Sequence, residues 1–148
     1  MKVPALFIDR DGTIIKQIDG EYISSINQIE LIETIFPAIL MLQNEGYLII
    51  MVTNQAGINK GILSKEQVDE INQHIIQSLK RQGIEVSAVY VCPHRTDEKC
   101  KCRKPEPGLL LKAAEEHNID LGNSVIIGDS DKDTEAGLKA GLKKVIKI

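Results

Sequence analysis

The segment VPALFIDRDGT, residues 3–13, joins an apolar run to a turn that carries two carboxylates. Its apolar part, residues 3–8, is nearly continuous, as expected of a strand that is buried on both faces of a parallel sheet. Four later segments have the same character and are also predicted to be strands: residues 47–53, 86–92, 124–128 and 144–148.

The segments between these strands have helical patterns. Helices are predicted for residues 35–44, from Ser64 to near residue 83, for residues 107–118 and for residues 131–141. Ser64 and Gln67 have the spacing of a capping box, in which each side chain binds a free backbone N–H at the helix start. The alternation predicts an α/β fold that is Rossmann-like, with three α/β/α layers and a five-stranded, mainly parallel sheet. We expect residues 1–148 to form a single domain.

Composition excludes several classes of protein. The net charge is −3, which argues against a general nucleic-acid binder, because such proteins usually carry a strongly basic face. No apolar run approaches the ~20 residues of a membrane span. The N-terminal apolar run is too short for a signal-peptide core and is followed at once by charges. We therefore expect a cytoplasmic protein that does not bind a membrane.

Two segments interrupt the alternation of strands and helices. Residues 14–33 follow the first strand and could form a small hairpin or flap, and residues 93–106 form a polar loop after the third strand. Ligands of open α/β sheets bind beyond the carboxyl ends of the strands. Both irregular segments are therefore predicted to border the functional site.

Carboxylates follow two of the predicted strands. Asp9 and Asp11 end the first strand, and Asp129 and Asp133 lie in GDSDKD after the fourth. A solvated turn would also explain Asp11, because Asp-Gly is a common turn signal. However, the ends of parallel strands meet at one edge of the sheet, and clustered carboxylates there would repel one another without a cation. Mg²⁺ prefers such oxygen ligands, so the pattern favours a magnesium site.

Phosphate-binding groups are predicted at the same edge. Thr53 and Asn54 end the second strand and offer hydroxyl and amide donors, while Lys104 in CRKPEPG precedes the third predicted helix. Four chain segments would thus supply a nucleophile, hydrogen-bond donors, a cation and metal ligands.

These four motifs, DRDGT, VTN, Lys104 and GDSDKD, resemble those of the haloacid dehalogenase-like phosphatases, in the same order and over nearly the whole chain. The resemblance implies that Asp9 attacks phosphorus and forms an aspartyl-phosphate. It implies that Asp11 is the general acid and base, and an acid at this position favours phosphatase over dehalogenase chemistry. It also implies that Mg²⁺ binds Asp9, the backbone carbonyl of Asp11 and Asp129.

The same resemblance gives roles to further residues. Thr53 and Lys104 would bind the transferring phosphoryl group, and Asn54, Arg103 and Lys104 would contact substrate. Asp133 would orient Lys104 or the water shell of the metal, and Thr13 would position Asp11. No large cap domain is present, so the fold is expected to be capless, with residues 14–33 and the polar loop shaping the pocket.

All three cysteines and one histidine lie within residues 92–102, which run from the end of the third predicted strand into the polar loop and are here named the cysteine loop. Cys92, His94, Cys100 and Cys102 make a complete tetrahedral zinc set. Free thiols and a surface histidine are the alternative, but cysteines are usually scattered rather than confined to one loop. We expect a structural Zn²⁺ that orders the loop and so holds Arg103 and Lys104 at the phosphate site.

The cysteine loop narrows the resemblance to a subgroup that contains D-glycero-D-manno-heptose 1,7-bisphosphate phosphatases and histidinol-phosphate phosphatases. The EPGLL that follows CRKP is more similar to the heptose enzymes, which favours removal of the C7 phosphate in the synthesis of activated heptose for lipopolysaccharide or other surface glycans. In Asn59-Lys60-Gly61, Lys60 stands where the family often has an arginine before the glycine.

A histidinol-phosphate phosphatase is the alternative within this subgroup. A non-catalytic zinc module, a nucleic-acid 3′-phosphatase and a phosphotransferase are the other hypotheses, and a monomer or small homo-oligomer is expected.

Overall fold

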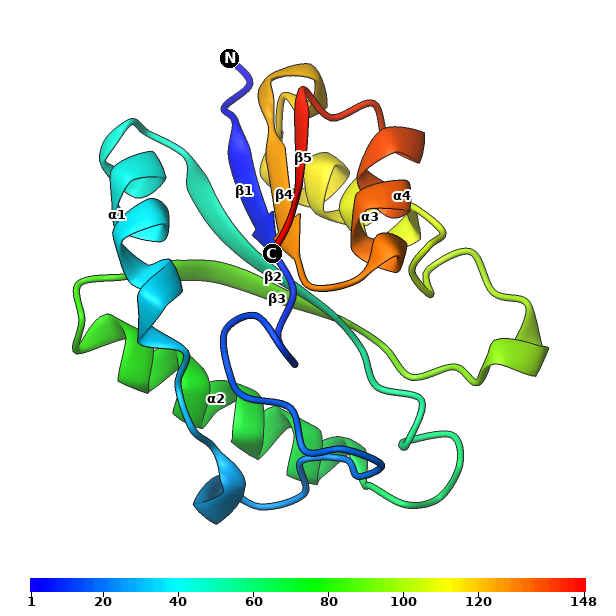
Figure 1. The fold of residues 1–148 in the computed structure, drawn as a ribbon. Helices are drawn as coiled ribbons and strands as arrows, with labels where there is room; N and C mark the ends of the chain where they lie inside the picture. Colours follow the sequence, from blue (N-terminus) through cyan, green and yellow to red (C-terminus); the bar gives the residue numbers. More distant parts are fainter.

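The computed structural model describes residues 1–148, which form one five-stranded sheet with helices on both faces (Figure 1). The strands are β1 (Ala5–Ile8), β2 (Leu48–Asn54), β3 (Val86–Cys92), β4 (Val125–Gly128) and β5 (Lys144–Lys147). Their order in the sheet is β3-β2-β1-β4-β5, and every neighbouring pair is parallel. The prediction of a mainly parallel sheet is confirmed, and the sheet contains no antiparallel strand.

The four predicted helices are present as α1 (Phe36–Asn44), α2 (Lys65–Lys80), α3 (Gly108–His117) and α4 (Asp131–Lys139). In Figure 1, α1 and α2 cover one face of the sheet while α3 and α4 cover the other, which confirms the three layers. The side chain of Ser64 accepts a hydrogen bond from the backbone of Gln67, so the predicted capping box starts α2. None of the helices is both long enough and apolar enough to cross a bilayer.

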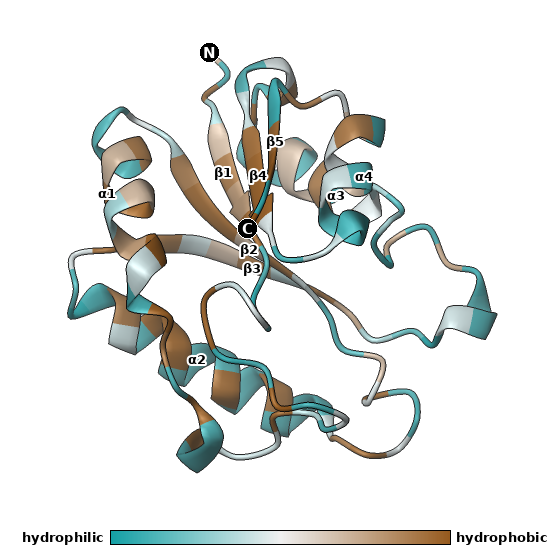
Figure 2. Ribbon diagram, viewed as in Figure 1, coloured by the Kyte–Doolittle hydropathy of each residue, from teal (hydrophilic) through white to brown (hydrophobic).

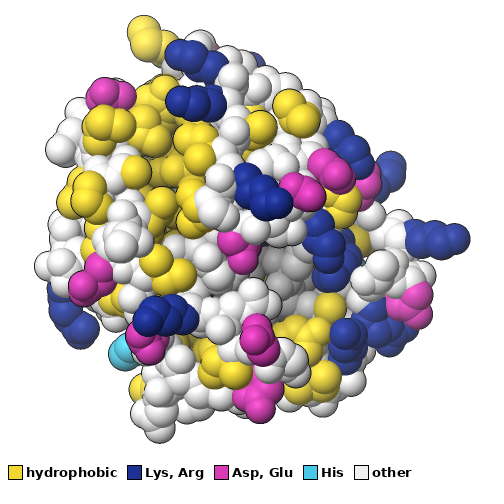
Figure 3. Space-filling model, viewed as in Figure 1, with side chains coloured by type: hydrophobic (Ala, Val, Ile, Leu, Met, Phe, Trp, Pro, Cys, Tyr) yellow, Lys and Arg dark blue, Asp and Glu magenta, His cyan; other side chains and the backbone are white.

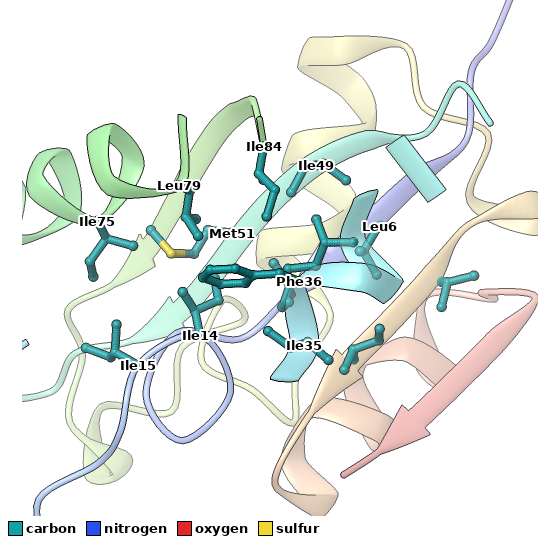
Figure 4. Packing of buried hydrophobic residues seen from close by; sticks show 14 of the residues in the cluster. Leu6, Ile14, Ile15, Ile35, Phe36, Ile49, Met51, Ile75, Leu79 and Ile84 are labelled. Carbon is teal, nitrogen blue, oxygen red and sulfur yellow. The ribbon is translucent and has the colours of Figure 1, made fainter. Parts of the chain in front are cut away.

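The two faces of β1 are buried in two separate apolar clusters. Leu6 and Ile8 point into the cluster beneath α1 and α2, and Ala5 and Phe7 into the cluster beneath α3 and α4. Figure 2 shows the apolar residues concentrated on the strands and on the inner sides of the helices. Figure 4 shows the first cluster, in which Phe36 lies among side chains of α2 and of the sheet. Each fully buried side chain of this size contributes about 1.5–3 kcal/mol.

Burial on both faces explains why β1 is the central strand, with β2 on one side and β4 on the other. The helices that follow β1 and β4 lie on opposite faces, so the connections diverge at the carboxyl ends of these two strands. Ligands of α/β sheets bind at such a divergence. Asp9 follows β1 directly at this point, and its backbone N–H donates to the carbonyl of Ile127 at 3.1 Å.

Residues 14–33 form a flap rather than a regular hairpin. Ile14, Ile15 and Ile23 are buried and anchor the flap to the core. A single antiparallel bridge joins Ile15 to Leu31, and a short 3₁₀ turn covers Ile26–Gln28.

Candidate functional site

A cleft of about 520 Å³ opens at the carboxyl edge of the sheet, between the ends of β1, β2 and β4. Part of the flap, from Gln17 to Ile23, lines one side of the cleft, and Arg103 and Lys104 of the polar loop line another. Both irregular segments therefore border the site, as predicted. Figure 3 shows the hollow with acidic and basic side chains gathered around it.

Lys104 is the centre of a buried ion cluster. Its Nζ donates to Asp9 Oδ1 at 2.7 Å, to Asp133 Oδ1 at 2.6 Å and to the carbonyl of Val52 at 3.0 Å. The side chain is only 3% exposed, so the three acceptors satisfy all three ammonium protons away from water. The structure thus brings the expected nucleophile into direct contact with the expected phosphate-binding cation.

Burial and the charge of the ion-pair partner shift the pKa values of Asp9 and Lys104 in opposite directions. Burial raises the pKa of Asp9 to about 7, and Asp133 adds to this effect while Lys104 opposes it. Burial lowers the pKa of Lys104, but the charges of Asp9 and Asp133 outweigh it and hold that pKa above its usual value. Lys104 is therefore a cation near neutral pH. Any further positive charge beside Asp9 would favour its ionised form.

Three carboxylates meet beside Lys104. Oxygens of Asp9, Asp129 and Asp133 all lie within 4.8 Å of one another. Lys104 and the backbone N–H of Ser130 engage the two oxygens of Asp133, whereas Lys104 makes no ion pair with Asp129. Asp9 and Asp129 therefore fit the role of ligands for a hard cation such as Mg²⁺, and Asp133 fits the role of orienting Lys104.

Two glycines make this close approach possible. A Cβ atom at Gly12 would lie 2.0 Å from Asp129 Oδ2, and a Cβ at Gly128 would lie 2.2 Å from Asp133 Oδ2. Gly12 also has a φ of +87°, a left-handed conformation that disfavours other residues. The glycines of the DG and GD motifs are thus needed because carboxylates occupy the space of their side chains.

Asp11 lines the cleft, but its side chain lies outside the acidic cluster. Arg10 Nε and Nη2 donate to its two oxygens at 3.1 Å each, and Gln55 Nε2 donates to Oδ2 at 2.7 Å. Sequence reasoning missed Arg10 and Gln55, although Arg10 stands between two expected catalytic residues.

The other polar side chains that were predicted to serve the site, Thr53, Asn54 and Thr13, make contacts that the sequence did not predict. Thr53 lines the cleft, where its Oγ1 accepts from Gln55 Nε2 at 2.8 Å. Asn54 also lines the cleft, but its side chain is bonded to the backbone of Lys104. Its Nδ2 donates to the carbonyl of Lys104 and its Oδ1 accepts from the backbone N–H of Lys104, both at 3.0 Å. Thr13 is fully buried, and its hydroxyl makes no hydrogen bond to Asp11 or to any other group.

Cys92, His94, Cys100 and Cys102 converge, with their donor atoms within 4.8 Å of one another. The sulfurs of Cys92 and Cys102 are 2.7 Å apart, and Nδ1 of His94 lies 3.2 Å from the sulfur of Cys102. None of the cysteines forms a disulfide. Three thiols and one imidazole at this spacing are compatible with a tetrahedral zinc-binding loop.

The loop is fixed to the start of α3 by Gly108. Its backbone N–H donates to the carbonyl of Lys101 at 2.9 Å, and a Cβ at this position would lie 2.3 Å from the same oxygen. The glycine of EPGLL is therefore required by the close approach of the cysteine loop.

Comparisons with known proteins agree with this geometry. The HAD-hydrolase-like family model matches residues 101–146. A D-glycero-beta-D-manno-heptose-1,7-bisphosphate 7-phosphatase from Pasteurella multocida is 39% identical over 150 residues, which cover 97% of this chain and 80% of the relative. The chain belongs to the haloacid dehalogenase-like phosphatases. The family resemblance read from the four motifs is confirmed.

Two further relatives of this phosphatase extend the comparison. A D-glycero-alpha-D-manno-heptose-1,7-bisphosphate 7-phosphatase from Campylobacter jejuni is 37% identical over 148 residues, covering 100% of this chain and 84% of the relative. The solved structure of D,D-heptose 1,7-bisphosphate phosphatase from B. bronchiseptica, complexed with magnesium and phosphate, is 29% identical with a TM-score of 0.85. The matched region covers 97% of this phosphatase and 79% of the B. bronchiseptica chain.

Proposed function

We propose that this phosphatase hydrolyses the 7-phosphate of a D-glycero-D-manno-heptose 1,7-bisphosphate through an aspartyl-phosphate on Asp9. The observation that carries the proposal is the buried contact between Asp9 and Lys104 at the base of a cleft lined by further cations. The substrate follows from the relatives, which are named for this activity. They do not favour histidinol phosphate, the alternative substrate.

In the first half-reaction, an oxygen of the Asp9 carboxylate attacks phosphorus, and the bond from phosphorus to the C7 oxygen of the sugar breaks. Lys104 and Thr53 bind the oxygens of the phosphoryl group as it moves to Asp9, and they stabilise its charge. Asp11 gives its proton to the leaving oxygen, so the sugar departs as an alcohol.

In the second half-reaction, the Asp11 carboxylate takes a proton from water, and that water attacks the phosphorus of the aspartyl-phosphate. The bond between phosphorus and Asp9 breaks, which releases inorganic phosphate and restores the Asp9 carboxylate. Splitting one displacement into two lowers the barrier of each step. Transfer to an alcohol in place of water would make the protein a phosphotransferase.

Asp9, Asp129 and the backbone carbonyl of Asp11 are the groups that would hold Mg²⁺. When bound there, the cation supplies positive charge that shields the nucleophile from the phosphate and stabilises the phosphoryl oxygens. The related B. bronchiseptica structure contains magnesium and phosphate, which supports this assignment. Lys104 already offsets part of the carboxylate charge, and Asp133 keeps its ammonium group in place.

The cysteine loop would bind a structural Zn²⁺ through Cys92, His94, Cys100 and Cys102. A polar loop of this length has few apolar contacts with which to order itself, so a metal that links its two ends offsets the entropy lost on ordering. The ordered loop then presents Arg103 and Lys104 to substrate. All four metal ligands come from the protein, which leaves no open position for catalysis.

A bisphosphate substrate suits the charge of the cleft. Besides Lys104, the cleft is lined by Lys60, Arg103 and Lys132, which can compensate the phosphate that is not transferred. Relatives are named for both the alpha and the beta anomer, so either anomer of the 1-phosphate is a candidate. The product would be the heptose 1-phosphate, and a cytoplasmic role in the synthesis of activated heptose follows from it.

The test is phosphate release with Mg²⁺ from heptose 1,7-bisphosphate and from histidinol phosphate, with Asp9→Asn as the matched control. We expect kcat/KM to favour the heptose by at least about a hundredfold, and the activity to vanish in the variant. Equal or greater activity on histidinol phosphate would overturn the substrate. Activity on neither ester by a folded protein would overturn the enzyme and favour a non-catalytic zinc module.

A further inference from the structure

Arg10 is a charged side chain in a place where charge is costly. Its side chain is 0% exposed, and it stands in the chain between Asp9 and Asp11. A buried guanidinium stabilises a fold poorly compared with an apolar residue of similar size. Its place in the chain between Asp9 and Asp11 therefore points to a role in the reaction beyond packing.

The contacts of Arg10 run from the site to α2. Its Nε donates to Oδ1 of Asp11 and its Nη2 to Oδ2, at 3.1 Å each, and Nη2 also lies 3.0 Å from Oδ1. Two guanidinium nitrogens on one carboxylate fix its plane. Its Nη1 donates to Oδ1 of Asn72 at 2.9 Å. Asn72 is buried on α2, so a regular helix anchors the guanidinium.

The hydrogen bonds to Asp11 fix the orientation of its carboxyl group at the edge of the cleft. A carboxylate has about four lone-pair sites. Arg10 uses one on each oxygen, and Gln55 Nε2 uses the second on Oδ2 at 2.7 Å. Oδ1 faces both Arg10 nitrogens, with Nε at 3.1 Å and Nη2 at 3.0 Å, and the carboxylate lines the cleft with 23% of its side chain exposed.

We propose that Arg10, anchored by Asn72, is a positioning residue that fixes the Asp11 carboxyl group so that this group hands its proton to the leaving oxygen. The inference rests on the proposed function, in which Asp11 is the general acid. As the proton moves from Asp11 to the leaving oxygen, Asp11 becomes the anion that a two-pronged guanidinium binds most strongly. Arg10 therefore favours the transition state over the ground state, and Arg10 itself does not touch substrate.

The leaving group provides a readout that a general loss of structure would not change. A sugar alkoxide needs a proton in order to leave, whereas p-nitrophenolate leaves without one. The value of kcat/KM reports the steps up to transfer of the phosphoryl group to Asp9. A defect in positioning Asp11 therefore lowers kcat/KM for the sugar phosphate much more than for p-nitrophenyl phosphate, while damage to Asp9 or Lys104 lowers both.

The experiment compares Arg10→Met and Asp11→Asn with both substrates in the presence of Mg²⁺. We expect Arg10→Met to lower kcat/KM about a hundredfold for heptose bisphosphate, and less than about fivefold for p-nitrophenyl phosphate. The double variant should lose little beyond Asp11→Asn alone, because the two residues act as one unit. Arg81→Met, on the exposed end of α2, is the matched control and should change neither value.

Arg10→Met removes a buried side chain and could unfold the protein, so Asn72→Ser is made as well. This variant keeps the contact between Arg10 and Asp11 but removes the anchor, and we expect about a tenfold loss that is confined to the sugar substrate. Equal losses on both substrates, or additive losses in the double variant, would overturn the inference. A wild-type protein without activity on either ester would instead overturn the proposed function.

Discussion

Replacing Lys104 with Met is expected to lower the free energy of unfolding of the Mg²⁺-free protein by about 3–5 kcal/mol at pH 8. The Lys104 ammonium lies 2.7 Å from Asp9 and 2.6 Å from Asp133. Met retains an apolar stem but removes the charge that both carboxylates face. Each lost hydrogen bond between charged groups is worth about 1.5–3 kcal/mol, so the two account for the expected loss.

The loss should be smaller at pH 6 than at pH 8. Burial raises the pKa of Asp9 to about 7 even with Lys104 present, and removing Lys104 removes a charge that lowers this pKa. A carboxyl group whose pKa is raised in the folded state destabilises the fold at high pH, and this cost fades as the pH falls through that pKa. Protonation therefore relieves part of the damage at pH 6.

Urea unfolding followed by circular dichroism at both pH values measures the effect, without added Mg²⁺ and without a chelator that would strip metal from the cysteine loop. Lys139→Met is the matched control. Lys139 pairs with Glu106 at 3.0 Å, but the two side chains are 46% and 45% exposed. We expect this control to change stability by no more than about 0.5 kcal/mol. A loss below about 1 kcal/mol for Lys104→Met at pH 8 would refute the view that Lys104 neutralises two buried carboxylates.

Three further predictions concern the glycine turn and the two metals. Gly12→Ala should lower the free energy of unfolding by about 1–2 kcal/mol, because of the positive φ, and should weaken Mg²⁺ binding, because the new Cβ displaces the carboxylate of Asp129. Calorimetric titration with Mg²⁺ checks the second effect, and unchanged affinity would contradict it. The Cys100→Ser, Cys102→Ser double variant should contain no zinc by elemental analysis and should raise KM more than it lowers kcat, and wild-type kinetics without zinc would count against the structural role. Mg²⁺ affinity should fall about tenfold from pH 8 to pH 6, because the cation binds ionised Asp9, whose pKa burial raises to about 7 in the metal-free protein. An affinity that is constant over this range would show that Asp9 is already ionised at pH 6.

The sheet was predictable because each strand carries its own signal. Residues 3–8 and 124–128 are apolar on both faces, and β1 and β4 form there. Glycines and capping residues set the helix ends within a few residues. The flap is different, because the buried Ile14, Ile15 and Ile23 have neither a strand nor a helix period, and only their packing against the sheet determines their path.

The acidic cluster was predictable for a related reason. Asp9, Asp129 and Asp133 follow parallel strands, and the fold brings such ends together regardless of side-chain detail. Arg10 and Asn72 were not predictable, because their contact joins positions that are 62 residues apart in the chain and depends on how α2 lies against the first turn. A charged residue between two carboxylates that were expected to be catalytic was nevertheless a signal that sequence analysis could have used.

The position of Lys104 shows why this site needs its cysteine loop. Lys104 belongs to no strand or helix, yet its ammonium must meet two carboxylates with little freedom. Asn54 at the end of β2 fixes its backbone from one side through two hydrogen bonds of 3.0 Å. From the other side, the sulfur of Cys100 accepts the backbone N–H of Arg103 at 3.3 Å, so the cysteine cluster holds the preceding residue. A metal bound by that cluster would therefore act on the phosphate site through one peptide unit, and this short path is why we expect zinc loss to affect substrate binding before it affects the chemistry of Asp9.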